Sequence, residues 1–267
     1  MFRRFPRGFS LLALAGVAAL FLSGCGGGSS TPGKDKDTPT KDKDTKDKDG
    51  KTDLGKPDFT LTSADFVKEF KTNAKDAHAK YKDKVIELTG VIASIGTNAG
   101  GEAVFLLEGP DPKGFDWTAV SFSEPRPWKK AAPGQKVKLK GKVHPDVSLA
   151  MLVYPQIVEV TGDEPPKLTA DDLGQEYAKG IEAAEKKYDK KWIILSGQIE
   201  KINEKDGILF KTKEKTPQVF ARFAPDQFKL VKDWKPGQNV TVIGQYLLNL
   251  GKDSVSLITS LPVDDPK

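Results

Sequence analysis

The chain has 267 residues, 30% of them charged, and its mean hydropathy of −0.45 excludes both a polytopic membrane protein and a uniformly disordered chain. Of the formal net charge of +5, residues 1–24 contribute +3 and residues 59–162 contribute +2, whereas residues 25–58 and 163–267 are each neutral. A strongly basic surface of the kind that binds nucleic acid is therefore not expected over most of the chain.

The N-terminus has the pattern of a secretory signal peptide. Three arginines in the first seven residues precede an unbroken apolar run at Leu11–Leu22. This run is shorter than the roughly 20 residues that a membrane-spanning helix needs, which argues against the alternative of an uncleaved anchor helix.

The next residues, Leu22-Ser23-Gly24-Cys25, resemble the bacterial lipobox. The resemblance implies cleavage before Cys25, lipidation of its thiol and acylation of the new N-terminus, and two or three acyl chains give stable anchoring. We therefore expect a membrane-anchored, extracytoplasmic lipoprotein on the periplasmic side. By analogy with enteric sorting rules, Gly26 implies the outer membrane if the host has two membranes. Cys25 is the only cysteine, so no internal disulfide can form.

Residues 25–58 are rich first in Gly and Ser and then in alternating Lys and Asp. They have no apolar periodicity, so we expect a disordered tether.

The remainder of the chain is a repeat. Residues 61–95 align without gaps onto residues 168–202, with 13 identities in 35 positions, and Pro133–Val137 matches Pro236–Val240. Self-similarity on this scale indicates a duplicated domain. We predict repeat 1 over residues 59–162 and repeat 2 over residues 166–263.

Each repeat begins with a helical pattern that Thr62 or Thr169 can cap. An alternating strand with a central glycine follows, and Ile95 and Ile202 fall one residue out of phase, which predicts a bulge or a bend beyond the glycine. Four more strands are expected in each repeat, at residues 103–108, 117–123, 136–144 and 149–160, and at residues 208–212, 218–223, 239–248 and 254–261. A short helix is expected only in repeat 2, at residues 225–234.

A helix followed by five strands, the first long and bent, predicts a mainly β fold with some α, a tandem of OB-fold barrels. The segments YxxK-V/W-I-x-L-x-G and PGQxV…G resemble the tRNA-anti-like OB-fold family of bacterial envelope and secreted proteins. These motifs mark turns and core positions, so the resemblance implies a fold more than an activity.

No enzyme site is evident. The chain has two histidines, His78 and His144, and neither lies at ligand spacing from another metal-binding residue. Hydrolase, zincin and P-loop motifs are absent from the sequence, and we expect no cofactor and no metal.

Two candidate surfaces emerge from strand alternation. Lys136, Lys138, Lys140 and Lys142 lie on one face of a strand, either as a solvated face or as an anion-binding stripe, and repeat 2 lacks them. On strands 2 and 3, where OB-folds usually bind, alternation predicts an outward-facing set formed by Phe105, Trp117, Phe220 and Arg222, with Leu209 beside them. Such side chains can stack on rings or pack between elements.

The sequence thus predicts a lipid-anchored, non-enzymatic binding or scaffold protein of the cell envelope, with a glycan, peptide or protein as partner. The alternative is single-stranded nucleic acid binding, which the near-neutral charge disfavours. The sequence leaves the oligomeric state open.

Overall fold

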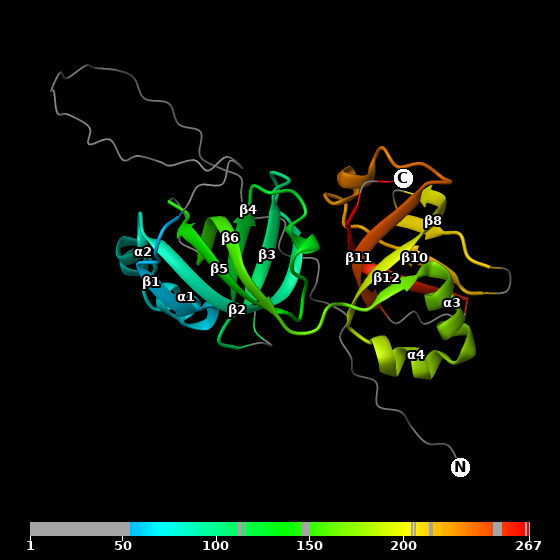
Figure 1. Ribbon diagram of the computed structural model, residues 1–267, viewed down its shortest axis with the longest axis horizontal. Helices are drawn as coiled ribbons and strands as arrows, with labels where there is room; N and C mark the ends of the chain where they lie inside the picture. The colour runs from blue at the N-terminus through cyan, green and yellow to red at the C-terminus, as the bar shows by residue number, and fades with distance from the viewer. Residues whose placement is uncertain are drawn as a thin grey trace, which may run out of the picture. The chain divides into compact units, whose positions relative to one another are not determined.

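The computed structural model describes residues 54–266 except 112–113, 115, 146–149, 204, 206, 214–215, 248–252 and 265. The expected signal peptide, Cys25 and the tether up to residue 53 lie outside these residues. Leu54–Lys267 form one compact unit that contains two β-barrels (Figure 1). Within the described part of the chain, no helix is long and apolar enough to cross a membrane.

The first barrel consists, in chain order, of β1 (Phe59–Thr62), α1 (Ser63–Thr72), α2 (Ala74–Tyr81), β2 (Val85–Thr97), β3 (Ala103–Glu108), β4 (Trp117–Phe122), the 3₁₀ turn η1 (Pro127–Lys129), β5 (Lys136–Val143) and β6 (Met151–Thr161). Its sheet order is β1-β2-β3-β4-β6-β5, and pairing of β2 with β5 closes it.

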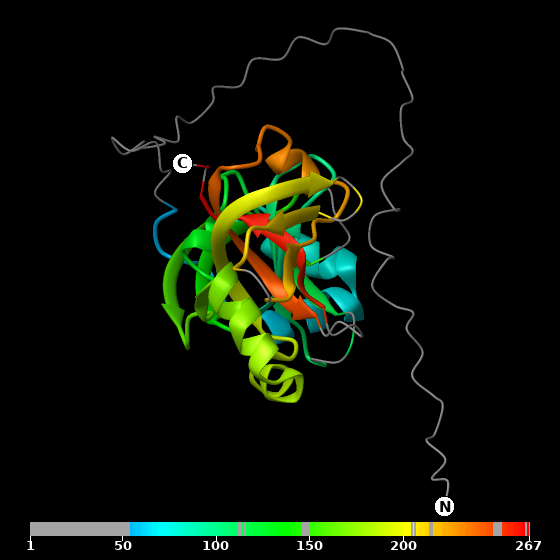
Figure 2. The ribbon, with the colours of Figure 1, turned by 90° about the vertical axis from the view of Figure 1, so that its right-hand side faces the viewer.

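The second barrel repeats this order with β7 (Lys167–Thr169), α3 (Ala170–Lys179), α4 (Ile181–Tyr188), β8 (Trp192–Asn203), β9 (Gly207–Phe210), β10 (Gln218–Ala221), η2 (Phe228–Val231), β11 (Asn239–Leu247) and β12 (Ser254–Pro262). Pairing of β8 with β11 closes it. The tandem OB-fold prediction is confirmed, and Figure 2 shows the long bent strand β8 in yellow.

The predicted bulge in the first long strand of each repeat is present. The register shifts between Ile92 and Ser94 in β2, and between Ile199 and Lys201 in β8. A bulge increases the local twist, so one strand can pair with β5 or β11 along its first half and with β3 or β9 along its second.

The structure corrects the prediction of one helix per repeat, because two helices are present. Asn73 ends α1, and its side-chain Oδ1 caps α2 by accepting a hydrogen bond from the backbone N–H of Asp76 at 3.2 Å. In repeat 2, Gly180 occupies the corresponding break between α3 and α4. The apolar periodicity continues across both breaks, so only the capping residues marked them.

Three shorter features also differ from expectation. Strands β1 and β7 were not predicted, and each pairs in parallel with the first half of the long strand. Repeat 1 has its own 3₁₀ turn, η1, whereas η2 is shorter than the predicted helix at residues 225–234. Trp128 of η1 is buried, and its indole N–H donates to the carbonyl oxygen of Pro262 at 2.7 Å.

A second bulge recurs where the last strand passes a glycine. Tyr154 in β6 and Thr259 in β12 both have φ of +52°. Opposite them lie Gly141 and Gly244, where an added Cβ would come within 2.6 Å of a side-chain atom of the facing strand. The close approach of the two strands therefore requires glycine at these positions.

Candidate ligand-binding face

The outer face of β8, β9 and β10 contains an exposed aromatic ring. In β10, Val219 and Ala221 are fully buried in the core, and Phe220 between them is half-buried on the outside. Leu209 of β9 lies directly opposite Phe220 and is also half-buried. Alternation along paired strands places these two side chains on the outer face, as the sequence predicted.

A hollow of about 210 Å³ opens on this face. Its lining residues are Lys201, Asn203, Gly207, Leu209, Gln218 and Phe220. The hollow therefore combines an aromatic ring and an aliphatic side chain with one ammonium group and two amides. This is the face that OB-folds commonly use for ligands.

Arg222 follows directly after β10 and is held beside this hollow. Its Nε–H donates to Oγ of Ser256 at 3.2 Å, and its Cζ lies 5.6 Å from the centre of the Phe220 ring. No acidic residue within the described ranges forms an ion pair with Arg222. The guanidinium is thus oriented by the ring and the hydroxyl group while its charge is not neutralised.

The corresponding prediction for Phe105 is wrong. Phe105 is fully buried and packs against Phe122, with ring centres 4.6 Å apart. Directly opposite residues of an antiparallel pair share a face, and Phe105 lies opposite the core residue Val120. Trp117 is half-buried at the other end of β4, opposite Glu108, so the predicted pair is not brought together.

The same face of repeat 1 contains a carboxylate instead of an arginine. The hydroxyl group of Ser121 donates to Glu102 at 2.9 Å, and the side chain of Asn98 donates to it at 2.8 Å. These hydrogen bonds, first from Asn98 and then from Ser121, lower the pKa of Glu102 below its usual value. The first barrel therefore presents a negative charge where the second presents a positive one.

The lysine stripe has the predicted alternation. Val137, Leu139 and Val143 point into the core, and the four lysines are exposed or half-buried on the outer face. Lys138 forms an ion pair with Glu159 at 3.2 Å.

A larger hollow of about 750 Å³ lies over β8 and β11 beside the start of α3, and it was not predicted from the sequence. Its polar lining includes Thr169, Asp171, Gln198, Lys211, Lys213 and Asn239. These residues come from segments far apart in the chain, so no local pattern could reveal the hollow.

The two histidines are in contact through the ring of one and the backbone of the other. Nε2 of His78 lies 3.2 Å from the backbone carbonyl oxygen of His144, a contact between α2 and the end of β5. Across the described ranges, His, Cys, Asp and Glu side chains form no group of three or more that could hold a metal ion.

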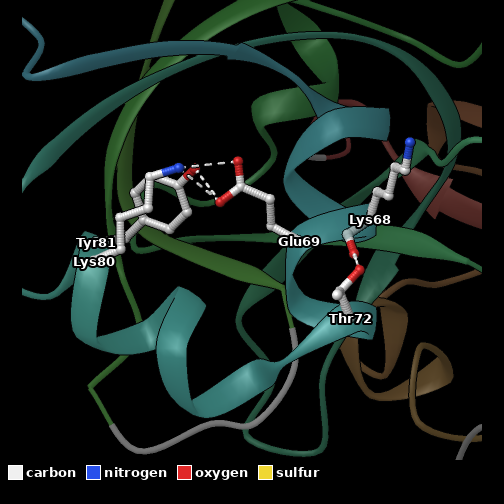
Figure 3. Close-up of polar contacts among 5 residues, drawn as sticks. All are labelled: Lys68, Glu69, Thr72, Lys80 and Tyr81. Carbon is white, nitrogen blue, oxygen red and sulfur yellow. Dashed lines mark hydrogen bonds and ion pairs between the residues drawn. The ribbon is translucent and has the colours of Figure 1, made fainter.

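One titratable cluster occurs in both repeats. Glu69 accepts hydrogen bonds from Lys80 at 2.8 Å and from Tyr81 at 2.8 Å, as Figure 3 shows. Glu176 accepts the equivalent bonds from Lys187 and Tyr188 at 2.9 and 2.7 Å. Because each cluster joins two consecutive helices and recurs with the fold, we interpret it as structural.

In each six-stranded sheet five strands close into a barrel, through the β2–β5 pairing in repeat 1 and the β8–β11 pairing in repeat 2, and the two barrels define a tandem OB-fold protein. The family model for tRNA_anti-like proteins matches residues 9–157 and again residues 153–258. The chain belongs to the tRNA_anti-like family.

Similar solved structures include a protein of Klebsiella pneumoniae subsp. pneumoniae MGH 78578, named as a candidate nucleic acid-binding lipoprotein. It is 22% identical over 38% of this chain and 91% of its own, with a TM-score of 0.30. The Stn1–Ten1 complex of S. pombe is 24% identical over 30% of this chain and 59% of the matched one, with a TM-score of 0.24. A murine DNA-binding protein bound to double-stranded DNA is 12% identical over 68% and 98%, with a TM-score of 0.22. No curated protein matches the sequence.

Proposed function

We propose that the protein is a lipid-anchored, non-enzymatic binding protein of the cell envelope, and that it binds its ligand on the outer face of β8, β9 and β10. The observation that carries this proposal is the contact between Arg222 and the half-buried ring of Phe220 beside the 210 Å³ hollow. An aromatic ring can stack on a flat part of a ligand, and an oriented cation beside it can bind a negative group of the same ligand.

The lining chemistry supports one ligand class. The ring of Phe220 and the side chain of Leu209 offer a flat apolar surface, and the amides of Asn203 and Gln218 offer donors and acceptors. Sugar rings present an apolar face and a polar rim, and cell-wall glycans also bear carboxylates that Arg222 and Lys201 could pair with. An envelope glycan with attached peptide therefore fits best.

Single-stranded nucleic acid is the second candidate, because bases also stack on aromatic rings and an OB-fold commonly presents them there. The charges in repeat 1 count against it. A strand that continued over both barrels would meet Glu102 on the equivalent face. We expect binding to oligo-dT no tighter than about 10⁻⁴ M at physiological salt.

The test is calorimetric titration of residues 25–267, with Cys25→Ser to remove the lipid, against disaccharide-peptides released from bacterial cell wall. Phe220→Ala with Arg222→Ala should weaken binding at least about tenfold, because it removes the stacking surface and the cation. The matched control is Lys229→Ala with Leu230→Ala, which removes an exposed cation and an exposed aliphatic side chain outside the hollow.

Equal binding by both variants and the unchanged protein would exclude this face. Oligo-dT serves as the competing probe. If oligo-dT binds at micromolar concentration and only Phe220→Ala with Arg222→Ala abolishes that binding, the nucleic acid candidate replaces the glycan.

A further inference from the structure

The outer surface of β5 and β6 in repeat 1 carries both cations and exposed apolar side chains. The four lysines of the stripe, Lys136, Lys138, Lys140 and Lys142, alternate with core residues along β5. On the adjacent strand β6, Tyr154 is 69% exposed and Val158 is 50% exposed.

The strand register places these residues together. Tyr154 lies between Val153, which pairs with Lys142, and Gln156, which pairs with Lys140. Val158 lies next to Glu159, which pairs with Lys138. Each exposed apolar side chain therefore stands beside a lysine of the stripe, and we call this the β5–β6 surface.

The fold itself does not require these side chains. In repeat 2 the stripe positions hold Asn239, Thr241, Ile243 and Gln245. The bulge position of Tyr154, with φ of +52°, holds Thr259 there at the same φ. Since the barrel of repeat 2 closes without the lysines and the tyrosine, we infer that these side chains have a role other than closing the barrel.

The chain enters the fold at this surface. The ammonium group of Lys140 donates to the carbonyl oxygen of Gly55 at 3.2 Å, and Leu54 is the first residue that the structure describes. The 28 residues from Gly26 to Asp53 connect this point to Cys25. A chain of this length spans at most about 95 Å when fully extended.

We propose that the β5–β6 surface docks on an anionic phospholipid surface. Lysine ammonium groups pair with headgroup phosphates, tyrosine is a residue of the membrane interface, and an apolar side chain such as Val158 enters the headgroup boundary. This proposal builds on the proposed lipid anchor, because a lipid at Cys25 would attach the chain to the membrane at the end that meets the β5–β6 surface. Docking would then fix which faces of the barrel point away from the membrane.

Two neighbouring carboxylates limit how strongly the β5–β6 surface binds an anionic membrane. Glu87 pairs in register with Lys140, and Glu159 forms its ion pair with Lys138. These two acids offset half of the stripe's charge, so the surface should bind weakly from solution. Attachment through a tether raises the effective concentration and makes weak docking persistent.

The test measures sedimentation of residues 25–267 carrying Cys25→Ser with vesicles of pure phosphatidylcholine, or of equal parts phosphatidylcholine and phosphatidylglycerol. We expect binding to the anionic vesicles alone, and loss of that binding at high salt. Lys136→Glu with Lys142→Glu, and separately Lys138→Glu with Lys140→Glu, should each weaken it at least about tenfold. Tyr154→Ser should weaken binding without changing its salt dependence.

The matched control is Lys229→Glu with Lys232→Glu, which makes the same charge change at exposed lysines of repeat 2. Equal loss in this control would show a net-charge effect and overturn the proposal, as would absence of binding to anionic vesicles. Binding to oligo-dT that depends on the same stripe lysines would assign the surface to nucleic acid. Because the lipid is absent from this chain, the outcome is independent of whether Cys25 is the anchor.

Discussion

The hydroxyl group of Tyr188 donates a hydrogen bond of 2.7 Å to Oε2 of Glu176. Tyr81 and Tyr188 are both almost fully buried, and the hydroxyl group of each donates to a glutamate carboxylate on the preceding helix. The bond connects α2 to α1 across the break at Asn73, and α4 to α3 across the break at Gly180. The tyrosines therefore keep each broken helix pair folded against its barrel.

Removing this bond should lower stability similarly in both repeats. Tyr81→Phe and Tyr188→Phe keep the ring and remove only the hydroxyl group, so each should lower the free energy of unfolding by about 1.5–3 kcal/mol, as expected for a hydrogen bond to a charged acceptor. Urea unfolding followed by circular dichroism gives the change. A cost near zero for both would show that the bond is not stabilising.

The same clusters predict acid sensitivity. Burial opposes ionisation of Glu69, but hydrogen bonds from Lys80 and Tyr81 outweigh it and lower its pKa. The hydrogen bond from Lys187 lowers the pKa of Glu176 despite burial. A carboxyl group with a lowered folded pKa stabilises the fold fully above its unfolded pKa of about 4.3, and the contribution disappears as pH falls through the folded pKa.

Thermal unfolding at neutral pH and at successively lower pH tests this dependence. The double variant Glu69→Gln with Glu176→Gln should be less stable at neutral pH and should lose less stability on acidification. If the variant and the natural sequence show parallel pH curves, other carboxyl groups govern acid unfolding.

Glycine should be required more strictly in repeat 2 than in repeat 1. An alanine at position 244 would place its Cβ 2.9 Å from Cβ of Leu257, an atom fixed to the backbone. At position 141 the nearest atom is the mobile end of Leu152, at 2.6 Å. We expect Gly244→Ala to cost about 1–3 kcal/mol and Gly141→Ala less, as measured by chemical denaturation. The reverse order would mean that the strands near Gly244 can separate.

Membrane attachment should depend on Cys25. In a bacterial host, Cys25→Ser should abolish incorporation of labelled fatty acid and release the protein from washed membranes, because the proposed lipid acceptor is the thiol of Cys25. Retention of the variant with membranes, through the apolar run at Leu11–Leu22, would favour the anchor-helix alternative.

The sequence was sufficient to predict the bulged long strand and the five barrel strands of each repeat, although it did not predict β1, β7 or the break in each helix. The phase shifts at Ile95 and Ile202 predicted the strand bulges, and the apolar alternation predicted five strands in each barrel. The position of Phe105 was not predictable from alternation alone, because the choice of face depends on which residue it pairs with across strands. The helix break at Asn73 was obscured because the apolar stripe continues past it.

The candidate face could be predicted only in part. Alternation within β10 placed Phe220 outside, but the contact of Arg222 with Ser256 depends on the parallel pairing of β10 with β12. Such contacts between distant segments follow from strand register, which local sequence patterns leave open.

At the equivalent bulges of Tyr154 and Thr259, the backbone conformation does not depend on which side chain is present. The strand pairing and the facing glycine hold φ at +52° whichever of the two residues is present. Each barrel thus has one outer position with a fixed backbone conformation. A substitution there changes the outer surface of the barrel and leaves the barrel closed. A duplicated domain with such a point can acquire different surfaces on its two copies by single substitutions.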